Sequence, residues 1–76
     1  MAIEVTDIGK SGLYVVEHDN DVYVHDNYDD AVTCNRTECN DDGEYHFHGF
    51  SKRPTYSEAE MTVEYFYPNQ NIINRV

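Results

Sequence analysis

The chain has 76 residues and a formal net charge of −10, with 15 acidic residues against five Lys and Arg. This charge excludes nucleic acid and anionic membranes as direct partners and favours basic surfaces. Seven Tyr and three Phe argue against a disordered acidic tail, because disordered segments lack the large apolar groups that offset chain entropy.

The length allows one small acidic domain that covers residues 1–76. No stretch approaches the roughly 18 apolar residues of a membrane helix, and the N-terminus lacks the form of a secretory signal. The expected location is therefore the cytoplasm, that of a host cell if the protein is viral.

Strands and one helix are predicted in the first half of the chain. Alternating or apolar runs predict strands over Ile3–Ile8, Leu13–Glu17 and Val22–His25, separated by turns rich in Gly, Asp and Asn. Asp26 and Asn27 have the character of a helix N-cap, and acids follow in the first turn. A short helix is therefore expected from Tyr28 to about Arg36.

The second half begins with a turn at Asn40–Gly43 and the clearest strand, Glu44–Phe50. Ser57 opens a pattern that resembles a capping box, yet β-branched and aromatic residues alternate over Met61–Tyr67, which favours a strand there. Ile72 and Ile73 are expected in a packed tail. The predicted fold is α+β: a small, mostly antiparallel sheet of about five strands, with one short helix between the third and fourth strands.

The acidic residues are concentrated between Glu17 and Glu44. This stretch holds ten acids against one base, Arg36, a net of −9 of the total −10. Such segregation favours a binding surface over a merely solvated one. Tyrosines among the acids, such as Tyr45, are expected as exposed anchors, because Tyr is enriched at interface hot spots. The predicted contact residues are Glu17, Asp19, Asp21, Tyr23, Asp26, Tyr28, Asp29, Asp30, Asp41, Asp42 and Glu44.

Metal binding and catalysis have weaker signals. Cys34, Cys39, His46 and His48 offer two thiols and two imidazoles, the donors that zinc prefers, but their C-x4-C-x6-H-x-H spacing departs from that of zinc fingers. The acidic turns do not match the calcium loop of EF-hands. No nucleophile or phosphate-binding motif is present, and an acidic surround disfavours a reactive thiolate. No enzyme activity, cofactor or resident metal is therefore predicted.

In size, acidity and Tyr content the chain is similar to small inhibitors that phages and mobile elements use against restriction or CRISPR nucleases, some of which mimic DNA. This resemblance lies in composition and assigns no residue a role. The sequence favours a non-enzymatic protein that binds the basic, nucleic-acid-binding surface of a nuclease or DNA-binding protein. A zinc-stabilised structural domain and an acidic halophilic domain stay open as alternatives, and nothing in the sequence forbids a homodimer formed through an edge strand.

Overall fold

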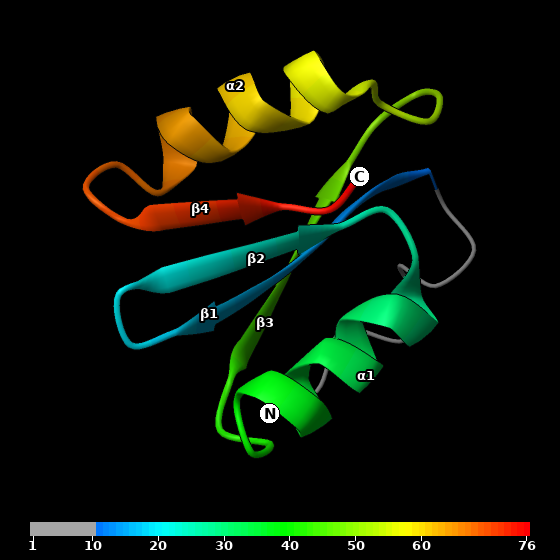
Figure 1. The fold of residues 1–76 in the computed structure, drawn as a ribbon. Coiled ribbons are helices and arrows are strands. Elements are labelled where there is room, and N and C mark those ends of the chain that lie inside the picture. The colour runs from blue at the N-terminus through cyan, green and yellow to red at the C-terminus, as the bar shows by residue number, and fades with distance from the viewer. Residues whose placement is uncertain (1–10) are drawn as a thin grey trace.

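A computed structural model describes residues 11–76 of the chain. Strands and helices follow one another in the order β1 (Gly12–His18), β2 (Asp21–His25), α1 (Tyr28–Glu38), β3 (Glu44–Gly49), α2 (Tyr56–Phe66) and β4 (Asn71–Asn74). The strands form one sheet in the order β3-β1-β2-β4. β1 is antiparallel to both β2 and β3, whereas β4 is parallel to β2. The α+β class is confirmed, with a helix on each face of the sheet (Figure 1).

The central strands are apolar because both faces of the sheet are covered. Successive side chains of a strand point to opposite faces. Tyr14 and Val16 of β1 therefore pack under α1, whereas Leu13 and Val15 pack under α2. The same alternation divides β2 and produces two clusters of buried side chains, one on each side of the sheet. This explains why Leu13–Glu17 reads as an almost continuous apolar run.

The predicted helix after β2 is confirmed as α1. The Asn27 side chain accepts a hydrogen bond from the main-chain N–H of Asp30, at 3.1 Å, and so caps the first turn. Asp29 and Asp30 lie in that turn, at the positive end of the helix dipole. The predicted strand over Glu44–Phe50 is confirmed as well, as β3, which ends one residue earlier at Gly49.

The predicted strand over Met61–Tyr67 is wrong, because this segment belongs to the helix α2. A capping box begins the helix at Thr55: its hydroxyl accepts from the Glu58 N–H at 3.2 Å, and the Glu58 carboxylate accepts from the Thr55 N–H at 2.9 Å. Ala59 and Val63, four residues apart on one side of α2, are fully buried against the sheet. Their burial and the cap outweigh the β-propensity of the segment.

The expected mostly antiparallel sheet of about five strands is also corrected. The structure shows four strands within residues 11–76, and the C-terminal isoleucines form β4. β4 is parallel to β2 because the chain returns through α2. The strand predicted over Ile3–Ile8 lies outside the described residues. Across residues 11–76, neither helix has the length and apolarity needed to cross a membrane.

Candidate functional site

Six of the predicted contact acids gather at one end of the sheet. The antiparallel register pairs Glu17 of β1 with Glu44 of β3, and His18 of β1 with Asp21 of β2. The turn between β1 and β2 carries Asp19, and the loop before β3 carries Asp41 and Asp42. We call this group the acidic end; its members are Glu17, Asp19, Asp21, Asp41, Asp42 and Glu44.

A shallow hollow of about 370 Å³ opens at the acidic end. Glu17, Asp19, Asp42 and Glu44 line it together with His18. Residues from β1, β3 and two loops thus present carboxylates to a shared volume of solvent. Because side chains on neighbouring strands are only about 5 Å apart, the negative potential in this hollow is the sum of several close charges.

The other three predicted acids lie elsewhere. Asp26 follows β2 at its far end, and Asp29 and Asp30 are in the first turn of α1. Asp21 and His25 are four positions apart along β2, a distance of about 13 Å. The structure therefore divides the predicted contact residues into two groups. In the second group, Asp26 forms an ion pair with Arg53.

Within residues 11–76, none of the six carboxylates of the acidic end forms an ion pair with Lys or Arg. Their recorded partners are two histidines, His18 and His46, and the side-chain amides of Gln70 and Asn71. The described arginines that do form ion pairs, Arg53 and Arg75, bind Asp26 and Glu38 instead.

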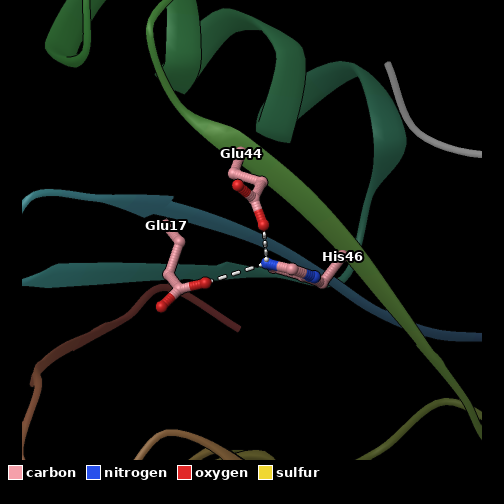
Figure 2. A group of neighbouring side chains, drawn as sticks. All are labelled: Glu17, Glu44 and His46. Atoms are coloured by element: carbon pink, nitrogen blue, oxygen red, sulfur yellow. Dashed lines mark hydrogen bonds and ion pairs between the residues drawn. The ribbon is translucent and has the colours of Figure 1, made fainter. Parts of the chain in front are cut away.

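Glu17, Glu44 and His46 form the tightest cluster of the site (Figure 2). Two carboxylates directly opposite each other on one sheet face repel. His46 lies between them: its Nε2 is 2.9 Å from Glu17 Oε1 and 3.4 Å from Glu44 Oε1. An imidazole Nε2 carries at most one proton, so His46 cannot donate a full hydrogen bond to both carboxylates at once.

Neighbouring residues hold this cluster in position. Gln70 donates a hydrogen bond from Nε2 to Glu17 Oε2, at 2.6 Å. The ring of Tyr67 packs against His46, with centroids 5.6 Å apart, and its hydroxyl is 2.7 Å from His48 Nε2. Burial, followed by the charges of Glu17 and Glu44, raises the pKa of Tyr67 to about 12. Burial, and then the charge of His46, lowers the pKa of His48, so this pair stays uncharged at neutral pH.

The tyrosines predicted as exposed anchors of the contact surface are buried or partly buried. Tyr23 is buried in the cluster under α1, and Tyr28 and Tyr45 are partly buried against it. The exposed aromatic residues are on α2: Tyr56, Tyr65 and Phe66 are 57%, 79% and 54% exposed. Had residues 56–66 been predicted as a helix, the 3.6-residue period would have indicated that Tyr65 is exposed, because it is on the side opposite Ala59 and Val63.

The structure does not bring the four candidate zinc ligands together. Cys34 and Cys39 are buried on the α1 side of the sheet. His46 and His48 point to the other side, where His48 contacts Tyr67. Burial, followed by the charge of Glu38, raises the pKa of Cys34 to about 12, and burial raises that of Cys39. Both thiols are therefore protonated at neutral pH in the metal-free protein.

Comparison with protein-family models, curated proteins and solved structures finds no match to this chain.

Proposed function

We propose that this chain is a non-enzymatic binding protein whose acidic end contacts the basic, nucleic-acid-binding surface of another protein. The observation that carries the proposal is the set of six carboxylates without a Lys or Arg partner among residues 11–76. A compact field of this kind attracts a basic groove and speeds the encounter. A nuclease or DNA-binding protein is the favoured partner, and occupation of its groove would inhibit it by mimicry of DNA charge.

The rigidity of the acidic end supports mimicry over a disordered acidic segment. Glu17 and Glu44 are fixed by strand pairing, and Asn71 donates a hydrogen bond to Asp21 at 3.1 Å. The carboxylates of Glu17 and Asp21 are thus held in place before binding, which reduces the entropy cost of ordering them in a complex. Duplex DNA offers one charge per about 1.7 Å of axis, and the carboxylates of the acidic end likewise gather negative charge on adjacent strands and loops.

Charge reversal at the acidic end tests this proposal. Asp42→Lys with Glu44→Lys changes two exposed residues in the loop and at the strand start. Asp29→Lys with Glu64→Lys makes the same charge change at exposed helix positions away from the acidic end. We expect the first pair to weaken partner binding by at least about 30-fold, roughly 2 kcal/mol, because like charges then face each other in the interface. The second pair should bind nearly as the wild type does.

The measurement is a pull-down from a lysate of the source organism, with the wild type and the two double variants as baits. It is carried out at about 0.1 M and about 1 M salt, because the electrostatic screening length falls from about 10 Å to about 3 Å between these concentrations. The partner should be lost at high salt and should be displaced by duplex DNA. Equal retention by both variants, or no displacement by DNA, would refute charge mimicry. Circular dichroism of each variant confirms that the fold is intact.

A further inference from the structure

We infer that Glu17, Glu44 and His46 form a binding site for a zinc-type divalent cation. The three side chains each offer one ligand atom, and these atoms lie within 4.8 Å of one another (Figure 2). This site shares only His46 with the ligand set that the sequence suggested. It is also independent of the proposed function, because a cation could bind here whether or not the acidic end has a protein partner.

The distances suit a metal ion with minor adjustment. Zinc binds imidazole nitrogen and carboxylate oxygen at about 2.0–2.2 Å, so that two ligands at the tetrahedral angle are about 3.4 Å apart. His46 Nε2 lies 2.9 Å from the Glu17 oxygen and 3.4 Å from the Glu44 oxygen. The remaining adjustment falls on Glu44, whose side chain is 54% exposed. Solvent reaches this cluster, because both glutamates line the hollow at the acidic end.

The chemistry of the donors selects the class of cation. An imidazole among the ligands disfavours Ca²⁺ and Mg²⁺, which prefer oxygen alone, and the lack of a thiolate disfavours Cu(I). Two carboxylates cancel the charge of a divalent ion. A dication also resolves the electrostatic conflict described above, since it attracts both glutamates at once and a single Nε2 proton does not.

A second observation beside the cluster points the same way. Gln70 fixes the outer oxygen of Glu17, which leaves Oε1 directed at His46, and such outer-shell bonds are typical of metal sites. The other end of the same amide, Gln70 Oε1, is buried and has no hydrogen-bond partner among residues 11–76. Buried acceptors are rarely left unpaired. This oxygen is on the same amide group as the Nε2 that binds Glu17, so a hydrogen-bond acceptor without a partner among residues 11–76 lies beside the proposed site.

Metal titration of the full chain tests the inference. After dialysis against a chelator, isothermal titration with ZnCl₂ at neutral pH should show one ion bound per chain. His46→Gln and Glu17→Gln, which keep the size of the side chains, should each weaken binding by at least about 10-fold, the effect that loss of even an outer-shell partner has. Glu64→Gln, an exposed carboxylate on α2, is the matched control and should bind as the wild type does.

Cobalt distinguishes this site from one that uses the cysteines. Co²⁺ bound by nitrogen and oxygen shows only weak visible bands, whereas thiolate ligands add an intense charge-transfer band. We expect no such band with the wild-type chain. Three results would each overturn the inference: failure of the wild-type chain to bind one zinc ion, unchanged zinc affinity in both His46→Gln and Glu17→Gln, or a thiolate charge-transfer band with Co²⁺. Circular dichroism without metal, which should match the wild type, separates ligand loss from unfolding.

Discussion

Asn35 shows how one buried polar residue shapes the acidic end. It is 3% exposed, and its side chain accepts a hydrogen bond from the Gly43 N–H at 2.7 Å and donates one to the Tyr45 hydroxyl at 2.9 Å. Its main-chain oxygen accepts from the N–H groups of Cys39 and Asp41. From its helical position, Asn35 therefore fixes the loop that carries Asp41 and Asp42 into β3.

Gly43 is required by the same contact. A Cβ atom at this position would lie 2.3 Å from Asn35 Oδ1 and 2.4 Å from Val16 Cγ1. Such distances are far below van der Waals contact, and the neighbours are buried. Because Gly43 has no side chain, the loop can pack closely against α1 and β1. The sequence places Gly43 in the predicted turn Asn40–Gly43, whereas the structure has the turn at Asn40 and Asp41 and puts Gly43 in the loop just before β3, with a packing role that the sequence does not show.

Asn35→Ala should lower the free energy of unfolding by about 1–3 kcal/mol, because the buried Gly43 N–H loses its acceptor. Thr37→Ala is the matched control: Thr37 is exposed on the same helix, and its hydroxyl donates a hydrogen bond to the Thr33 carbonyl of the same helix. The control should change stability by less than about 0.5 kcal/mol. Urea unfolding measures both values, and equal losses would contradict the role assigned to Asn35.

At the scale of elements, local patterns predicted most of the sheet and failed where tertiary contacts decide. β1, β2, α1 and β3 follow from alternation, turn residues and the Asn27 cap. Residues 61–67 alternate as a strand would, but the helix is chosen by the Thr55 cap and by packing of Ala59 and Val63 on the sheet. The parallel pairing of β4 with β2 follows from the crossover through α2. The wrong prediction of a strand over residues 61–67 therefore also made the predicted sheet topology wrong.

The candidate site was predicted in part for a related reason. The concentration of acids between Glu17 and Glu44 is visible in the sequence, and six of them do meet. Their separation from Asp26, Asp29 and Asp30 depends on the register of β1 with β2 and β3. The contact of Glu17 with His46 joins residues 29 positions apart through pairing of β1 with β3, which no local pattern encodes.

The cap at Thr55 gives a prediction for α2. Thr55→Ala removes the acceptor of the Glu58 N–H and should lower the free energy of unfolding by about 1 kcal/mol. Ser57→Ala is the control, because Ser57 is exposed inside the first turn and the cap lies at Thr55. Urea unfolding compares the two variants. A larger loss for Ser57→Ala would place the helix start at Ser57 and contradict the observed cap.

On the scale of the whole molecule, the charge is distributed unevenly around a sheet with two helical layers. Two described arginines form ion pairs away from the acidic end: Arg75, beyond β4, binds Glu38, and Arg53, before α2, binds Asp26. Arg75 also lies over the ring of Tyr23, 5.3 Å from its centroid. These two arginines thus join parts of the chain that are distant in sequence, and within residues 11–76 neither of them forms an ion pair with the acidic end.

His25 should make the stability of the fold depend on pH. It is 6% exposed, and its Nε2 has no hydrogen-bond partner among the described residues. Burial, and then the charge of Arg75, lowers the pKa of His25, and the nearby acids Asp30, Glu38 and Asp26 oppose this shift only in part. The unfolded chain, with a histidine pKa of about 6.5, therefore binds a proton more readily than the folded chain does.

Stability should accordingly fall as the pH drops below about 6.5 and continue to fall until the folded-state pKa of His25 is passed. His25→Gln should reduce the loss of unfolding free energy between about pH 7.5 and about pH 5.5. Part of the loss should persist, since burial also lowers the pKa of His48. Urea unfolding at both pH values measures the difference. Between about pH 7.5 and about pH 9, where histidine is uncharged in both states, the variant and the wild type should change in parallel. If the wild type and His25→Gln lost the same unfolding free energy between about pH 7.5 and about pH 5.5, protonation of His25 would not oppose folding.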